Sequence, residues 1–132
     1  MRTIVDFEIP AGKEIKRTII DFLLENNIEN GYIVGAIGSV VDVRIAAPVA
    51  HELPPQTVEV PYGVSAEVVG FTGEVIPWDK VDSHLASVYP DKDDPVFVHI
   101  HIAAAMAGGQ VFGGGLRSGK AFRALRVFML PL

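Results

Sequence analysis

The fold is decided by residues 95–103, which read PVFVHIHIA. Side chains alternate along this stretch, so His99 and His101 share one face of a strand while Ile100 and Ile102 share the other. This alternation predicts a half-buried β-strand. The two histidines would lie about 6.6 Å apart, at roughly 3.3 Å per residue, and both imidazoles can then converge on one metal ion.

A pair of histidines is an incomplete zinc site, because zinc ions in proteins take at least three protein ligands. The same pattern arises where a half-exposed polar strand face uses histidine twice. From spacing alone, His99 and His101 are candidate metal ligands, and a plain polar strand face is the alternative.

A glycine-rich stretch follows at residues 107–116, which read AGGQVFGGGL. Glycine loses more backbone freedom on folding than any other residue, so this density of glycines indicates a geometric need. Gly108-Gly109 predicts a tight turn. Gly113, Gly114 and Gly115 predict close contact of the backbone with another chain or a ligand, and their amides could cradle an anion.

The rest of the chain reads as one helix among strands. Residues 13–26 place Ile15, Ile19 and Leu23 at helical spacing, with Lys16 mostly on the outer, polar side. Strands are expected at residues 3–8, 31–37, 39–46, 65–76, 95–103, 109–116 and 122–130. The order predicts one α+β domain over residues 1–132, a mostly antiparallel sheet with a helix packed on one face.

Two segments interrupt the strands. Residues 47–62 hold four prolines and read as a loop with a short extended piece at Val58–Val60. Residues 77–94 are too polar for a core strand and predict a short helix from Asp79, as its cap, to Tyr89. An insertion of this length is often a lid or binding loop, and a surface excursion without a role is the alternative.

Charge and composition exclude several classes of protein. The chain has no cysteine, which rules out disulfides, thiolate metal sites and cysteine nucleophiles. It lacks an apolar signal core and any apolar run of the roughly 18 residues that a membrane span needs, so we expect a soluble, cytoplasmic protein with no membrane partner.

The net charge of −5 disfavours nucleic acid as a partner. The charge is uneven, however, because residues 95–132 contain no acidic residue and four basic ones: Arg117, Lys120, Arg123 and Arg126. These residues form a solvated edge, pair with acidic residues elsewhere in the fold, or make an anion site near the C-terminal strands.

Two apparent motifs are rejected. Gly114, Gly119 and Lys120 match the spacing of a phosphate-binding P-loop, but Ala121 stands where that motif needs serine or threonine. The run 82–84, Asp-Ser-His, is sequence adjacency rather than the geometry of a catalytic triad.

Several blocks of this sequence, in their order and spacing, resemble the PPC (plants and prokaryotes conserved) domain. The blocks are residues 10–14 (PAGKE), 35–40 (GAIGSV), 67–73 (EVVGFTG), 99–101 (HIH) and 113–116 (GGGL). The resemblance implies an α+β fold, similar to acetolactate decarboxylase, and a homotrimer. Plant members carry AT-hook DNA-binding motifs, whose Arg-Gly-Arg core is missing here, and prokaryotic members are often labelled as DNA-binding by analogy.

The resemblance also bears on the site. Many prokaryotic members have His-x-His followed by Gly-Gly-His-Leu, which implies three histidine ligands for a metal such as zinc. His99 and His101 match the first two positions, but Gly115 occupies the third. Three alternatives remain: His84 supplies the missing ligand, directly or across a subunit interface; the site has become a metal-free organic or anion pocket with Arg117 nearby; or the chain has no active pocket here.

Three functions stay open from the sequence. The first is a homotrimer with a small-molecule or anion pocket, bound by Gly113, Gly114, Gly115 and Arg117, in which His99, His101 or Arg117 could be catalytic. The second is a DNA-associated or scaffold protein. The third is a zinc-dependent, lyase-like enzyme with an altered third ligand. The sequence leaves open whether the chain is an enzyme.

Overall fold

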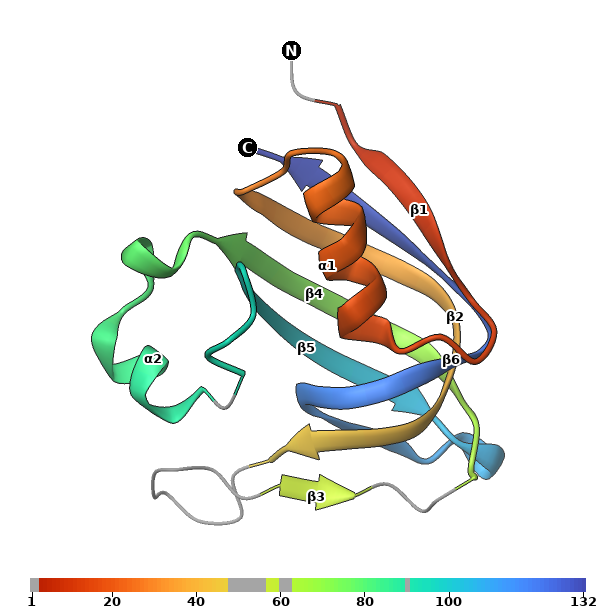
Figure 1. Ribbon diagram of the computed structural model, residues 1–132. Helices are drawn as coiled ribbons and strands as arrows, with labels where there is room; N and C mark the ends of the chain where they lie inside the picture. Colours follow the sequence, from red (N-terminus) through yellow and green to blue (C-terminus); the bar gives the residue numbers. More distant parts are fainter. Residues whose placement is uncertain (1–2, 48–56, 60–62, 90) are drawn as a thin grey trace.

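A closed, antiparallel β-sheet carries one main helix in the computed structural model (Figure 1). The structure describes residues 3–47, 57–59, 63–89 and 91–132. The strands are β1 (Val5–Pro10), β2 (Gly31–Ala46), β3 (Thr57–Glu59), β4 (Ala66–Ile76), β5 (Phe97–Ala105) and β6 (Val111–Pro131). The helices are α1 (Ile15–Glu25), α2 (Ser83–Val88) and two single 3₁₀ turns, η1 (Trp78–Lys80) and η2 (Ala107–Gly109).

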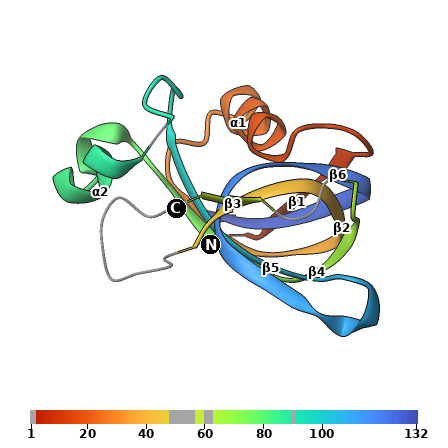
Figure 2. The same ribbon diagram turned by 90° about the horizontal axis from the view of Figure 1, so that it is seen from below.

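The sheet closes because β6 pairs with more than one neighbour. The strand order is β1-β6-β5-β4-β2-β3, and β6 also pairs with β2, so β6, β5, β4 and β2 form a small barrel. Figure 2 looks into this ring, with α1 lying outside the strands. The expected α+β fold with a mostly antiparallel sheet and one main helix is confirmed.

Two predicted strand breaks were wrong, because the strands bend instead of ending. β2 runs unbroken through Gly38, where a side chain would collide with the carbonyl oxygen of Ala124. β6 joins the two strands expected at 109–116 and 122–130, and residues between them pair with β2. The glycines that the sequence analysis placed at strand ends instead permit the close contacts between strands in a small barrel.

Helix α1 begins and ends as its sequence suggests. Glu14 caps it, since its carboxylate accepts a hydrogen bond of 2.7 Å from the backbone N–H of Arg17. At the other end Asn27 takes a left-handed conformation, with φ of 55°. Lys16, expected on the outer side, is instead only 6% exposed. Side chains from the insertion at residues 77–94 cover it, which helix periodicity could not reveal.

The insertion forms two short helices rather than one. Its described residues, 77–89 and 91–94, project from the barrel between β4 and β5 (Figure 1). The cap of α2 is Asp82 rather than Asp79, because the carboxylate of Asp82 accepts from the backbone N–H groups of His84 and Leu85. In the loop at 47–62, the expected extended piece appears as β3, and residues 48–56 and 60–62 lie outside the described residues.

The core joins the inward-facing side chains of the strands to the buried face of α1 in one cluster. The largest fully buried side chains are Phe71, Phe97, Ile9, Ile15, Ile19, Ile20, Leu23, Ile33, Ile100, Leu125, Met129 and Val40. Within the described part of the chain, no helix is long and apolar enough to cross a membrane.

Candidate functional site

A cavity of about 200 Å³ lies on the outer face of the sheet, beside His99 and His101. Its lining comes from three adjacent strands: Tyr32 of β2, Thr72, Gly73 and Glu74 of β4, and His99 and His101 of β5. The outer face is identified by the residues next to these, since Ile33, Val75 and Ile100 point the other way and are buried. Both predicted histidines therefore face one cavity.

Strand register brings the polar side chains into rows. Tyr32 is opposite Glu74, and Glu74 is opposite His99. Thr72 is opposite His101 in the same ladder. Because directly opposed residues of antiparallel strands share a face, a phenol, a carboxylate, a hydroxyl and two imidazoles gather within one patch.

Gly73 makes this row possible. A side chain at Gly73 would collide with the carbonyl oxygen of His99 and would lie 3.1 Å from the Cα of Ile100. The missing side chain lets β4 and β5 lie close together between Thr72 and Glu74. A glycine inside a strand is typical of a bulge or of a close backbone contact, and at Gly73 the structure has the close contact.

The histidines are held by each other and by Glu74. The Nδ1 atom of His99 is 3.4 Å from the Oε1 atom of Glu74, and the two side chains are 30% and 47% exposed. The ring of His99 meets that of His101 edge-on, with 4.9 Å between centroids. His101 is exposed to solvent. The site thus has hydrogen-bond donors and acceptors that a small polar molecule can reach.

Sequence reasoning missed Glu74, Thr72 and Tyr32 as site residues. Thr72 and Glu74 are alternate polar residues in a predicted strand, which was the available signal for an outward face. Their placement beside the histidines depends on which strands are neighbours and in what register, and alternation alone leaves both undetermined.

The predicted glycines lie next to the site without lining its cavity. Gly115 is directly opposite His101, and Gly114 is opposite Ile102. The close backbone contact expected here occurs within the chain, since a side chain on Gly114 would lie 2.7 Å from the carbonyl oxygen of Ala46. The turn expected at Gly108-Gly109 is present as η2, with φ values of 82° and 81°.

Arg117 also lies outside the cavity lining. The ladder between β2 and β6 shifts here, because Leu116 is opposite Ile45 whereas Ser118 is opposite Arg44. Arg117 is the extra residue of this bulge, and its Nε atom is buried without a hydrogen-bond partner among the described residues.

The described residues do not fit a zinc ion. His84 is exposed on α2 and does not line the cavity that contains His99 and His101. No group of three histidine, aspartate or glutamate side chains in the described ranges is arranged to hold a metal. The described residues therefore bring two histidines to the cavity and do not supply the third ligand that zinc requires.

Comparisons with known proteins agree with this architecture. The structural match to a plant- and prokaryote-conserved (PPC) protein of Pyrococcus horikoshii covers 100% of this chain and 82% of that protein, with a TM-score of 0.77 and 24% identity. A metal-containing protein of Archaeoglobus fulgidus matches 98% of this chain and 79% of its own, with a TM-score of 0.75 and 27% identity. The match to a candidate DNA-binding protein of Ralstonia eutropha covers 96% of this chain and 76% of that protein, with a TM-score of 0.68 and 12% identity.

Comparison of the sequence with models of protein families identifies the family of this chain. A comparison with curated proteins returns no match. The model of the Plants and Prokaryotes Conserved (PCC) domain, in contrast, matches residues 1–132. With this match over the whole length, and with the strand order and the His-x-His strand in place, the chain belongs to the Plants and Prokaryotes Conserved domain family.

Proposed function

We propose that the protein is a homotrimer that binds a small polar molecule in the cavity beside His99 and His101. The observation that carries the proposal is the convergence of both histidines, Glu74 and Tyr32 on one open cavity of about 200 Å³. Imidazoles can donate, accept and transfer protons near neutral pH, so such a cavity suits binding and acid–base chemistry alike.

The lining favours an uncharged or cationic ligand over an anion. Glu74 contributes a carboxylate, and neither lysine nor arginine is among the residues that line the cavity. An anion would meet this carboxylate without an opposing guanidinium, since Arg117 lies elsewhere. The pocket expected from the sequence is thus supported, while an anion as its ligand is disfavoured.

A second copy of the chain is the partner we assign to the apolar surface next to the cavity. Four large apolar side chains on β2 and β4 are 42% to 70% exposed: Tyr32, Val34, Ile37 and Val69. Tyr32 also lines the cavity, so this surface continues into the site. Together with the trimer that the family resemblance implies, it supports an interface that borders the cavity.

Light scattering tests the assembly. The trimer has three times the 14.2 kDa mass of the chain. Val69→Asp places a charge on this surface and should dissociate the trimer, whereas Leu24→Asp, on the 51% exposed position of α1, should not. A wild-type protein that stays monomeric at high concentration would reject the assembly.

Ligand binding is tested by NMR of the histidine ring signals. Ribose, ethanolamine, acetate and inorganic phosphate represent the uncharged, cationic, carboxylate and phosphate classes. We expect ribose or ethanolamine to shift the signals of His99 and His101 saturably, and His101→Ala to abolish the effect while His84→Ala preserves it. If only phosphate shifts these signals, the proposed ligand class is wrong. If neither these compounds nor a wider set of small polar compounds shifts the ring signals of His99 and His101, the cavity is not a binding site.

DNA association is the second candidate, because relatives in Ralstonia eutropha and Bacteroides thetaiotaomicron are named as candidate DNA-binding proteins. The basic C-terminal part supports it only weakly. Arg126 is paired with Asp6 at 2.7 Å, and the Nε atom of Arg117 is buried. A gel-shift titration at low salt decides: no retarded duplex would reject this candidate.

A zinc-dependent enzyme is the third candidate. Its only support is the metal-containing relative and the two histidines, so a third ligand would have to come from outside the described residues of one chain. Metal analysis of protein purified without a histidine tag is the test. Less than stoichiometric zinc, unchanged by His99→Ala, would reject it.

A further inference from the structure

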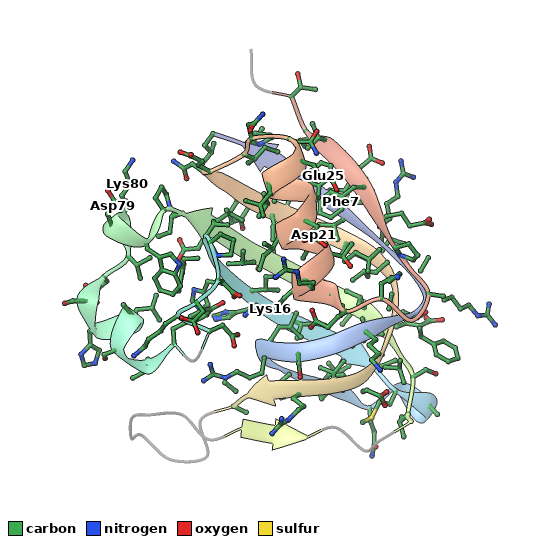
Figure 3. All side chains as sticks on the ribbon, viewed as in Figure 1. Phe7, Lys16, Asp21, Glu25, Asp79 and Lys80 are labelled. Atoms are coloured by element: carbon green, nitrogen blue, oxygen red, sulfur yellow. The ribbon has the colours of Figure 1, made fainter. Side chains whose placement is uncertain are left out.

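The insertion between β4 and β5 is built as a separable unit. Its two ends meet, because Ile76 and Phe97 are partners in the sheet that flanks it. Neither η1 nor α2 contains a buried residue. Asp79 and Lys80 lie at its outer edge, pointing away from the barrel (Figure 3). The described residues 77–89 and 91–94, here called the flap, can therefore move without breaking the backbone hydrogen bonds between the strands of the barrel.

The flap is attached to the barrel through an aromatic cluster. Tyr89 is 6% exposed, and its ring lies 4.7 Å from that of Phe97 between centroids. Trp78 meets Phe97 edge-on at 5.3 Å, and its indole N–H donates to the carbonyl oxygen of Asp94 at 2.7 Å. A few aromatic contacts of this kind are individually weak, which suits a reversible attachment.

One buried cation fastens this cluster to α1. Lys16 lies at the lower end of α1 in Figure 3. Its ammonium donates to the hydroxyl oxygen of Tyr89 at 2.6 Å and to the carboxylate of Asp91 at 2.9 Å. The same ammonium is 4.7 Å from the centroid of the Tyr89 ring. Both partners belong to the flap, so an open flap leaves Lys16 without them.

Lys16 is charged in this environment. Burial by itself would lower the pKa of Lys16, but the hydrogen bonds and charges of Tyr89 and Asp91 outweigh it and raise that pKa above its ordinary value. A paired buried charge that loses its partner is strongly destabilised. The ammonium therefore favours the closed flap.

The closed flap also reaches the candidate site. The hydroxyl group of Tyr89 donates to the carbonyl oxygen of Val98 at 2.6 Å, next to His99 in the chain. The ring of Phe97, against which the flap packs, lies 5.6 Å from the ring of His99. The aromatic cluster thus supports the end of β5 from which His99 enters the cavity.

We propose that the flap is a hinged cover, latched by Lys16, and that its opening releases the Val98–His99 end of β5 and thereby alters the cavity. Lys16 and Tyr89 act on His99 through Phe97 and the Val98 carbonyl, so they are positioning residues. The proposal concerns the docking of the flap and stands whether or not the cavity binds a small molecule.

Trp78 reports the state of the latch, because it is the chain's only tryptophan and belongs to the cluster. Lys16→Met keeps the length of the side chain and removes its charge. We expect a red-shifted Trp78 emission and at least a twofold increase in acrylamide quenching, at a temperature where circular dichroism shows an intact fold. The matched control, Lys80→Met, changes an exposed lysine of the flap and should behave as wild type.

Two further readouts separate positioning from general destabilisation. In Lys16→Met the ring signal of His99 should shift in NMR spectra while that of His84 stays in place, and trypsin should cut faster at Lys80 and Lys92. If Lys16→Met does not fold, Tyr89→Phe, which keeps the ring and loses the hydroxyl group, takes its place. A folded variant with wild-type quenching, His99 signal and cleavage rate would overturn the latch.

Discussion

Gly115 lies directly opposite His101 in the ladder between β5 and β6. A side chain built on Gly115 would share the face of His101 and make only ordinary contacts, the nearest being 3.7 Å to the Cβ atom of Ala46. The third position of the family's three-histidine pattern therefore lacks a side chain, not the space for one.

Gly115→His should create a metal site. His99, His101 and the new imidazole would then face the cavity from adjacent strands, and three histidines complete the ligand set of a catalytic-type zinc ion. We expect about one equivalent of zinc per chain, measured by isothermal titration and elemental analysis, and less than stoichiometric zinc in the wild type.

Gly114→His is the matched control for this gain. Its side chain would lie 2.7 Å from the carbonyl oxygen of Ala46 and on the other face of β6, so it should lower stability without binding zinc. A folded Gly115→His protein that binds no more zinc than the wild type would contradict the claim that a side chain at position 115 can join His99 and His101 at one metal ion.

How much the sequence predicts depends on whether a feature is local. Alternation placed His99 and His101 on one face of a strand, and helical spacing located α1, because both patterns are properties of single elements. Glu74 and Tyr32 join the histidines only through the register of three strands, which a single sequence does not specify.

Two of the errors in the sequence-based description have the same origin. Gly38 looked like a strand end, but in a closed barrel it marks a bend where β2 lies against β6. Lys16 looked like a surface lysine, but Tyr89 and Asp91, more than 70 residues later in the chain, cover it and bind it. Tertiary partners thus override local pattern at these positions.

Gly73→Ala should disrupt the site and the sheet together. The added methyl group would collide with the carbonyl oxygen of His99, pushing β4 away from β5. We expect a loss of about 1–3 kcal/mol in the free energy of unfolding, measured in urea, together with shifted ring signals for both histidines. Gly70→Ala, whose methyl group would lie 3.7 Å from the Cβ atom of Ala103, serves as the control and should leave both quantities nearly unchanged.

Alkaline pH should weaken the latch. The folded-state pKa of Lys16 is raised because hydrogen bonds to Tyr89 and Asp91 outweigh burial, and burial raises that of Tyr89. Both protonated forms therefore stabilise the fold below the ordinary pKa values of 10.5 and 10.0, and this stabilisation is lost as pH rises through the folded-state values. Unfolding followed at a series of pH values should show this loss in the wild type. Lys16→Met combined with Tyr89→Phe removes both titrating groups, so the loss should be smaller in this double variant; equal pH slopes would refute the prediction.

Asp91 and Asp94 should respond in opposite directions when each is changed to asparagine. Asp91→Asn weakens the 2.9 Å ion pair with Lys16, and because the Asp91 side chain is 44% exposed we expect a loss of only about 1–2 kcal/mol. Burial, by contrast, raises the pKa of Asp94 above its ordinary 3.8, so its ionised form is disfavoured in the fold.

Asp94→Asn should therefore stabilise the protein at neutral pH. A carboxyl group with a raised folded-state pKa loses stability as pH rises from the unfolded value of 3.8 through the folded one, and asparagine does not titrate. The gain over wild type should be largest at pH 7 and vanish near pH 3, as measured by thermal unfolding across that range. The backbone carbonyl that accepts from Trp78 is unchanged in the variant, so docking of the flap is kept and the difference isolates the charge. If Asp94→Asn were less stable than wild type at pH 7, the carboxylate would have to stabilise the fold through a contact other than those described.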